Sequence, residues 1–166
     1  MELILESFNK IFILDESYLE IVILSLYISL SAAIFSSFIS IYLVSYIATS
    51  NFPGKGFIII LINTLMSLPP VVVGLVLYII FSASGLLGFM DILYSPAIMI
   101  IAQFIIITPI IMSLSLKALS DQYNLLNEYF LSLRASKTKI RRTIIFESRF
   151  NLLIVILTGF SRALSE

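Results

Sequence analysis

The chain has 166 residues, of which 60% are hydrophobic and only 12% are charged, and its mean hydropathy is +1.09. A soluble domain carries about 25% charged residues, so this composition indicates an integral membrane protein. The net charge is zero, but acidic and basic side chains are segregated along the chain. Cysteine and histidine are absent, which excludes disulfides, thiol nucleophiles and Cys/His metal sites and removes the commonest general base. An enzyme is therefore disfavoured.

A first membrane span is predicted over residues 21–48, which hold no charged side chain. These 28 residues form a helix of about 42 Å, longer than the hydrocarbon core of roughly 30 Å. The acidic residues before it do not form a secretory signal, which needs a basic start. Serines recur in the span, at Ser25, Ser29, Ser31, Ser36, Ser37 and Ser40. They suit close helix–helix contact, although a bond from each to its own helix is an equal alternative.

The second span is predicted over residues 57–81, after a turn rich in helix breakers. Pro69 and Pro70 interrupt it. Because proline lacks a backbone donor and clashes with the preceding turn, the pair should kink or break the helix inside the membrane. Such a break persists only where protein or a water-filled path satisfies the freed carbonyl groups. With Gly74, these prolines are candidates for a gate beside a translocation path; a static bend is the alternative.

The third span is predicted over residues 93–116, where the polar Gln103 and the helix-breaking Pro109 are further candidates for the path. The last apolar run, residues 150–160, is too short to cross a bilayer. Because the sequence stops at Glu166, we expect an incomplete fourth span over residues 150–166 of a longer protein, in preference to a re-entrant segment.

Arg162 and Glu166 are four residues apart in this last segment, so they share a helix face and can pair. About 20 Å of helix separates Arg162 from Arg149. At that depth an arginine usually faces a cavity or a partner. One interpretation is an oxyanion path, since a guanidinium suits a tetrahedral oxyanion. The other, which we favour, is an ion pair that fixes helix packing or a dimer contact.

Residues 117–149 carry seven of the ten basic side chains and only three acidic ones. The basic residues are Lys117, Arg134, Lys137, Lys139, Arg141, Arg142 and Arg149. Under the positive-inside rule this segment is cytoplasmic. The three spans then place Lys55 inside and both the Asp91 loop and the acidic N-terminus outside, so every loop charge agrees with one orientation.

Within this segment, Leu125, Leu126, Tyr129, Phe130 and Leu133 recur at three- and four-residue spacing. That spacing predicts one apolar stripe on a helix, and a second, basic helical stretch follows residue 136. An amphipathic helix of this kind can dock in the groove of a partner protein. It can equally lie on anionic lipid, held by the basic residues. The residues alone leave both possibilities open.

The segment EYFLSLRASKTKIRRTIIFE resembles the cytoplasmic EAA loop of permease subunits of bacterial ABC importers. Glu128 and Ile144 match that motif, and Arg134 stands where the motif has the glycine of a tight turn. The remaining differences are Tyr129 and Phe130 in place of two alanines, Phe146 in place of leucine and Glu147 in place of proline.

Three further segments resemble the oxyanion permeases for sulfate, molybdate and tungstate. SLPPVVVGLVLYIIFSASGLLG, residues 67–88, is similar to their second-span signature, and LYSPAIMIIAQFIIITPIIMSLSL, residues 93–116, to their next span. FESRFNLLIVILTGFSRALSE, residues 146–166, resembles the tungstate subfamily most. Its matches are Glu147, Arg149, Gly159, Phe160, Arg162, Ala163, Ser165 and Glu166. The resemblance covers roughly residues 20–166.

The resemblance implies an all-α membrane protein: one permease domain over residues 1–166, built as the polytopic helical bundle of ABC importers. The implied activity is tungstate transport across the cell membrane of a bacterium or archaeon. A pair of cytoplasmic partner subunits would bind and hydrolyse ATP, since the chain has no Gly-rich phosphate loop. An external oxyanion-binding protein would deliver the anion to a permease homodimer in the lipid bilayer. No cofactor, metal, catalytic residue or nucleic acid is expected.

The expected site residues form two sets. Those of the ATPase-coupling loop are Leu125, Leu126, Glu128, Tyr129, Phe130, Leu133, Arg134, Ala135, Ser136, Ile144, Glu147 and Arg149. Those of the translocation path are Pro69, Pro70, Gly74, Gln103, Pro109, Arg162 and Glu166. The alternatives are a molybdate or sulfate permease and, in a different class, a small membrane scaffold whose basic helix binds lipid.

Overall fold

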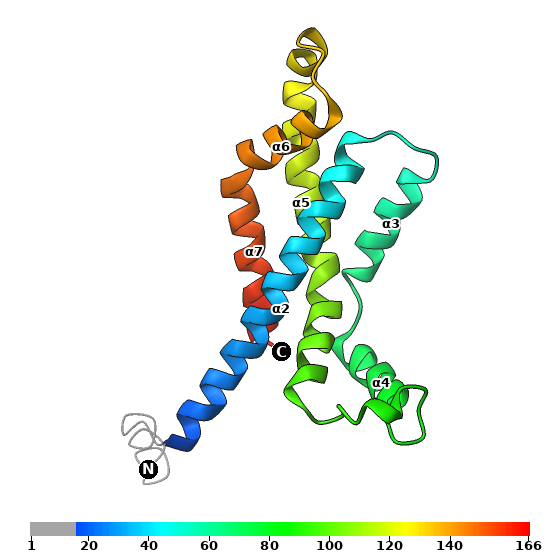
Figure 1. The fold of residues 1–166 in the computed structure, drawn as a ribbon, viewed down its shortest axis with the longest axis vertical. Helices are drawn as coiled ribbons and strands as arrows, with labels where there is room; N and C mark the ends of the chain where they lie inside the picture. The colour runs from blue at the N-terminus through cyan, green and yellow to red at the C-terminus, as the bar shows by residue number, and fades with distance from the viewer. Residues whose placement is uncertain (1–15) are drawn as a thin grey trace.

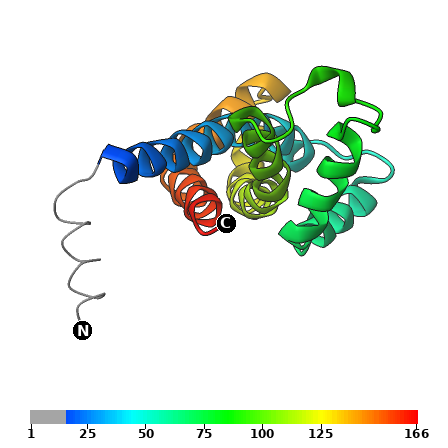
Figure 2. The ribbon, with the colours of Figure 1, turned by 90° about the horizontal axis from the view of Figure 1, so that it is seen from below.

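The computed structural model describes residues 16–166, and every regular element in that range is a helix (Figure 1). The elements are α2 (Glu16–Thr49), α3 (Lys55–Leu65), α4 (Pro70–Phe81), the short 3₁₀ helix η1 (Gly88–Met90), α5 (Pro96–Ser132), α6 (Lys137–Glu147) and α7 (Arg149–Leu164). α2 crosses α5, α7 packs against both, and α3 and α4 lie on the other side of α5 (Figures 1 and 2). The prediction of an all-α membrane bundle is confirmed. The acidic residues 1–15 lie outside the described range.

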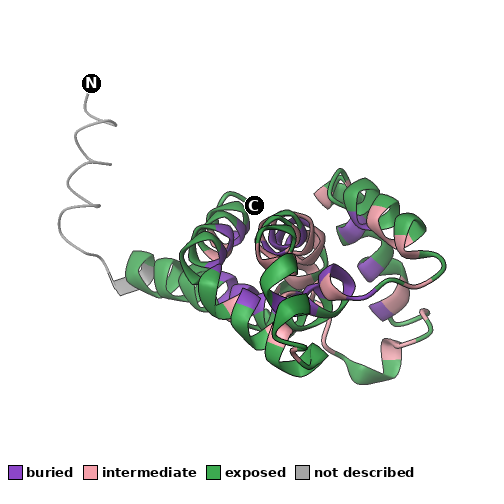
Figure 3. Cartoon of the chain, turned by 90° about the horizontal axis from the view of Figure 1, so that it is seen from above, coloured by how far each residue is buried: buried purple, intermediate pink, exposed green. Residues whose placement is uncertain are grey.

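Two helices among the described residues are long and apolar enough to cross a membrane, Tyr18–Thr49 and Pro96–Ser132. Two bent pairs, α3 with α4 and α6 with α7, bring the number of spans to as many as four if each pair counts as one. The predicted first span, residues 21–48, lies inside α2. Many large apolar side chains are exposed. The buried residues lie mainly where helices pack against one another (Figure 3). That distribution fits a protein surrounded by lipid.

The seam between α2 and α5 is built from small residues. Buried side chains of α2 recur here, at Ala32, Ala33, Ser36 and Ser40. Small side chains let two helix backbones approach closely, and the Ser40 hydroxyl reaches 3.5 Å from the carbonyl oxygen of Thr108 on α5. The burial of Ser29, Ser36, Ser37 and Ser40 agrees with the expected packing role, and Ser40 contacts α5 directly, whereas Ser25 is exposed and Ser31 is half-buried.

The second span is broken where the sequence predicts it. α3 ends at Leu65, α4 begins at Pro70, and the two helices are bent by 96°. Pro69 is extended, with φ −67° and ψ 131°, and Pro70 takes the first helical position, where the missing N–H has no partner to lose. After α4 the chain turns tightly at Gly85. This position requires glycine, because a Cβ atom there would collide with the carbonyl oxygens of Ile79 and Ile80.

The length of α5 differs from what the sequence predicts for the basic segment. Most of the predicted third span, residues 93–116, and nearly all of the apolar stripe, residues 125–133, belong to a single helix of 37 residues, Pro96–Ser132. Pro109 lies inside this helix without ending it. The first part of the predicted loop 117–149 is therefore a helical extension of a membrane span. It projects past the other helices at one end of the molecule (Figure 1).

Beneath this projection, one cluster of buried side chains joins five helices. It includes Val44 of α2, Ile62 of α3, Leu119 of α5, Ile144 of α6 and Leu152 of α7. α6 leads into α7 through a bend of 68° at Ser148. α7 has 16 residues, a length of about 24 Å, and covers most of the predicted fourth segment, residues 150–166.

Candidate functional site

The projecting end of α5 is closed by a well-formed helix cap. The N–H of Ala135 donates to the carbonyl of Phe130 at 3.1 Å, and the N–H of Arg134 donates to that of Leu131 at 3.2 Å. This pair of bonds is the Schellman motif. Arg134 occupies its left-handed position, with φ 46°, a conformation that glycine adopts most readily. The tight turn is thus preserved although arginine stands at the position of the motif's glycine.

The predicted apolar stripe divides into two rows. Leu126 and Phe130 face inward: Phe130 is only 9% exposed, and its ring stacks on Tyr123 with centroids 6.3 Å apart. Leu125, Tyr129 and Leu133 face outward and are 70%, 66% and 77% exposed. One row stabilises the tip, and the other is available to a partner. The apolar stripe expected from spacing is therefore divided between a buried row and an exposed row, and its docking on a partner stays a prediction.

We name the exposed Leu125, Glu128, Tyr129 and Leu133, with the cap residue Arg134, the coupling tip. A pocket of about 480 Å³ opens beside it, between the end of α5 and the start of α6. Its lining combines apolar side chains with two cations and two hydroxyls: Phe130, Leu133, Arg134, Ala135, Ser136, Lys139 and Thr143. Apolar walls with hydrogen-bond donors suit an aliphatic or acidic side chain of a partner protein.

The other predicted loop residues lie on α6 and at the start of α7. Ile144 is fully buried in the five-helix cluster. Glu147 is exposed at the end of α6. The guanidinium of Arg149 lies over the rings of Phe146 and Phe150, at 4.3 and 4.9 Å, and donates to the Phe146 carbonyl at 2.9 Å. Arg149 therefore fixes the bend between α6 and α7.

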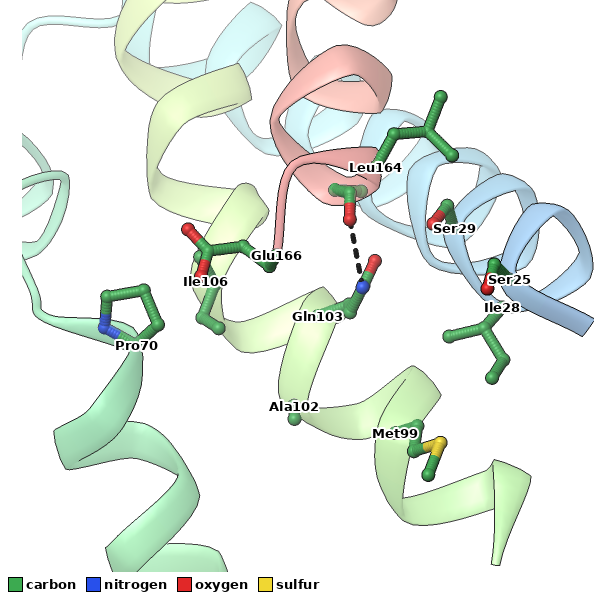
Figure 4. A pocket seen from close by; sticks show the side chains of 11 residues that line it. Ser25, Ile28, Ser29, Pro70, Met99, Ala102, Gln103, Ile106, Leu164 and Glu166 are labelled. Atoms are coloured by element: carbon green, nitrogen blue, oxygen red, sulfur yellow. Dashed lines mark hydrogen bonds between the residues drawn. The ribbon is translucent and has the colours of Figure 1, made fainter. Parts of the chain in front are cut away.

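A second pocket, of about 410 Å³, lies among α2, α4, α5 and the end of α7 (Figure 4). Its lining is mainly apolar, and we name it the polar pocket after the few polar side chains in that lining. It brings together three predicted path residues: Pro70, Gln103 and Glu166. Ser25 and Ser29 of α2 also line it, a role that their sequence does not indicate. The amide nitrogen of Gln103 donates to the Ala163 carbonyl at 2.9 Å.

The amide oxygen of Gln103 is buried and makes no hydrogen bond within the described part of the chain. A buried acceptor without a partner costs about 1–3 kcal/mol, so this atom is poised to accept a bond from water or a ligand. Gln103 is recognisable in the sequence as a polar residue in an apolar span, but the sequence does not place it against α2 and α7.

Arg162 and Glu166 form an ion pair at 2.7 Å, with side chains 45% and 23% exposed. The carboxylate lines the polar pocket and the guanidinium does not. Because an unpaired carboxylate would repel an anion, the pairing with Arg162 reduces that repulsion. The geometry supports the ion-pair interpretation, and direct contact between Arg162 and an anion stays a prediction.

The remaining path candidates do not join this pocket. Pro69 lies at the exposed break before α4, Gly74 on the outer face of α4, and Pro109 inside α5. A Cβ atom at Gly74 would meet nothing within 4 Å. Their gating role stays a prediction.

Comparison with known proteins gives several relatives, although no family profile matches the chain. The tungstate uptake system permease protein TupB of Peptoclostridium acidaminophilum is 35% identical over 170 residues, covering 100% of this chain and 75% of that protein. A probable anion ABC transporter permease of Haloferax volcanii is 32% identical, covering 92% of this chain and 66% of that protein.

TupB of Campylobacter jejuni subsp. jejuni is 33% identical over 119 residues, which cover 70% of this chain and 48% of that protein. The match to the Peptoclostridium acidaminophilum protein covers the whole chain. The chain therefore belongs to the family of ABC transporter permease proteins that includes the tungstate uptake permeases.

Proposed function

We propose that this chain is the subunit that carries tungstate inward across the cell membrane, driven by ATP hydrolysis on separate cytoplasmic subunits. The observation that carries the proposal is the 35% identity with a tungstate uptake permease over the whole chain. The apolar spans supply the membrane domain, and the coupling tip supplies a surface for a soluble partner.

The charge distribution supports an orientation with the coupling tip in the cytoplasm. Lys55 lies at the same end of the bundle as α6, bonded to the carbonyl of Ser50 at 3.1 Å. The loop that carries Asp91 lies at the opposite end, beyond α4 (Figure 1). Basic residues thus gather at one end. The polar pocket lies away from the tip, in the part of the bundle that would face outward.

The ATP-binding subunits would grip the exposed side chains Leu125, Tyr129 and Leu133. Aromatic and aliphatic anchors of this kind dominate binding energy when a partner desolvates them. α5 then acts as a lever. Gln103 and Tyr129 are 26 positions apart on this one helix, a separation of about 39 Å. Movement of the tip is therefore carried to the wall of the polar pocket without an intervening loop.

An oxyanion-binding protein outside the cell would deliver tungstate, and two copies of the permease would assemble in the bilayer. The family resemblance supports both parts of this assembly. α2 also exposes a row of aromatic side chains, Phe35, Phe38, Tyr42 and Tyr46, which another copy of the chain or lipid can cover.

Uptake of labelled tungstate into proteoliposomes that contain the permease, the ATP-binding subunits and the binding protein tests the proposal. Unlabelled tungstate should compete more strongly than molybdate, and molybdate more strongly than sulfate. ATP-dependent uptake that sulfate or molybdate blocks more strongly than tungstate would assign a different oxyanion. A complex that takes up none of the three would contradict the proposal.

Docking has its own test in Glu128→Lys. Glu128 is exposed beside Tyr129, so reversing its charge should change the interface and leave the core unchanged. Substrate-stimulated ATP hydrolysis should fall roughly five- to tenfold, the lower part of the range for coupling between sites, with normal membrane insertion. Unchanged coupling would remove Glu128 from the docking surface.

A further inference from the structure

The carbonyl end of α2 is held by cations from two other helices. The last turn of α2 contains no basic residue, although the negative end of a helix dipole favours one. Arg141 of α6 donates from Nε to the Thr49 hydroxyl at 3.1 Å, and its Cζ atom lies 4.5 Å from the centre of the Tyr46 ring. Lys55 of α3 donates to the Ser50 carbonyl at 3.1 Å.

The hydroxyl of Thr49 connects Arg141 to the helix backbone. It donates to the Ser45 carbonyl at 2.8 Å while it accepts from Arg141. Arg141 thus bonds a group that is itself fixed to α2, and the ring of Tyr46 holds the guanidinium from one face. We name Arg141, Thr49 and Tyr46 the α2 clamp.

The α2 clamp adds direction to an otherwise apolar contact. α6 meets the bundle through Ile144, which is fully buried in the five-helix cluster. Apolar packing is non-directional, so it permits sliding and rotation. The planar guanidinium instead requires a defined angle for both its hydrogen bond and its stacking. The α2 clamp therefore fixes the position of α6 relative to the end of α2.

The next residue on α6 provides a natural comparison. Arg142 is exposed, and its side chain makes no hydrogen bond, ion pair or cation–π contact with any described residue. Positive charge alone does not distinguish the two arginines, because both add equally to the basic cytoplasmic segment. Of these two arginines, only Arg141 contacts a membrane span, through Thr49 and Tyr46 of α2.

We infer that Arg141 is a positioning residue that carries movement of α6 into α2, and through Ser50 and Lys55 into the broken second span. This inference rests on the proposed function, because it assigns Arg141 to the coupling between ATP hydrolysis and transport. Arg141 touches neither nucleotide nor anion in this role.

The experiment compares Arg141→Met with the matched control Arg142→Met in the complete reconstituted transporter. The measured quantity is the amount of tungstate taken up per ATP hydrolysed. Arg141→Met should lower it roughly five- to tenfold, as expected for loss of coupling between two sites, whereas Arg142→Met should match the wild type. Arg141→Lys keeps the charge and loses the planar fork, so it should recover part of the loss.

Thr49→Val separates positioning from simple destabilisation, since it keeps the shape of the side chain and removes the hydroxyl. It should lower the ratio less than Arg141→Met. The double variant should be no worse than Arg141→Met alone, because residues in one contact are not additive. If the losses caused by Arg141→Met and Thr49→Val multiplied in the double variant, the two residues would act independently and the inference would be overturned. If the Arg141→Met complex fails to assemble, Arg141→Lys and Thr49→Val test the inference in its place. A wild-type amount of tungstate taken up per ATP hydrolysed in both of these variants would overturn it.

The wild-type control keeps this inference apart from the proposed function. A wild-type complex without tungstate-stimulated ATP hydrolysis overturns the proposed function. A wild-type complex that couples normally, with Arg141→Met equal to Arg142→Met, overturns only the role of Arg141.

Discussion

Replacing Gly159 with alanine should force α7 away from α5. Gly159 is buried where the two helices pack, and a Cβ atom there would lie 2.5 Å from Cδ1 and 2.6 Å from Cγ1 of Ile111. Carbon atoms in contact normally stay about 3.5–4.0 Å apart, so the overlap is roughly 1 Å. Ile111 is fully buried, and its β-branched side chain strongly prefers one rotamer in a helix. It cannot turn aside at low cost.

Overpacking of this kind destabilises a protein by about 1–3 kcal/mol. The higher helix propensity of alanine offsets about 1 kcal/mol of that cost. The free energy of unfolding should therefore fall by up to about 2 kcal/mol relative to the wild type, and by about 1–3 kcal/mol relative to a glycine-to-alanine change without this overlap. Ile111→Val removes Cδ1, the atom nearest to the added methyl group. The double variant should therefore lose less free energy of unfolding than the sum of the two single variants, because Ile111→Val relieves the overlap that Gly159→Ala creates.

The assay is denaturant unfolding of the purified protein in detergent, followed by far-UV circular dichroism. Gly56→Ala is the matched control, since a Cβ atom at Gly56, in the first turn of α3, would meet nothing within 4 Å. It should be neutral or slightly stabilising. If Gly159→Ala is as stable as this control, or if Gly159→Ala and Ile111→Val add exactly as independent changes, the close approach of α5 and α7 is refuted.

Three other predictions follow from the coupling tip and the polar pocket. Arg134→Gly should raise the free energy of unfolding by about 0.5–1 kcal/mol in the same assay, because glycine removes the left-handed strain but adds chain entropy on unfolding. Phe130→Ala should cost about 3–5 kcal/mol of stability, whereas Tyr129→Ala should leave stability unchanged and weaken binding of the ATP-binding subunit about tenfold, measured by titration of that subunit. Gln103→Leu loses a bond to Ala163 but removes an unpartnered oxygen, so stability should change by less than about 1 kcal/mol, while the KM for tungstate uptake should rise.

Each of these predictions has an outcome that contradicts it. Arg142→Gly lies inside α6 and should cost about 1 kcal/mol, so a similar loss for Arg134→Gly would argue against strain at the cap. Equal loss of stability for Tyr129→Ala and Phe130→Ala would show that the two rows of the tip are not distinct. An unchanged KM in Gln103→Leu would remove the polar pocket from the tungstate path.

The parts of the fold that could be predicted are those set by local sterics and composition. The break at Pro69 and Pro70 follows from the missing donor and the ring clash, and the span inside α2 follows from 28 uncharged residues. The pairing of Arg162 with Glu166 follows from helical spacing. None of these features depends on a distant part of the chain.

The length of α5 was mispredicted because hydropathy marks where a span leaves the membrane, not where a helix ends. Residues 110–158 contain neither glycine nor proline, a signal that the helix would continue past the charge boundary. Its end at Ser132 depends instead on the Schellman bonds and on Arg134 in a left-handed conformation. Glycine is the usual residue at that position and arginine is not, so residue propensity does not predict that the helix ends here.

The polar pocket and the α2 clamp could not be predicted, because each joins residues that are distant in sequence. Arg141 and Thr49 are 92 positions apart, and Gln103 and Ala163 are 60 apart. Their contacts depend on the crossing of α2 over α5 and on the bend at Ser148, and both of these are set by packing. The signals that were available, a threonine at a helix end and a glutamine in a span, fit many other arrangements.

The two long helices explain why the proposed coupling needs the α2 clamp as well as the coupling tip. Both helices line the polar pocket, α2 with Ser25 and Ser29 and α5 with Gln103. A partner that grips the tip moves α5 directly, but α2 ends at Thr49 and contributes nothing to the tip. If α5 moved alone, the small-residue seam between the helices would shear, which close packing resists. Arg141 ties α2 to α6, about 30 Å of helix from Ser29, so the two walls of the pocket move together when the tip and α6 move as one body.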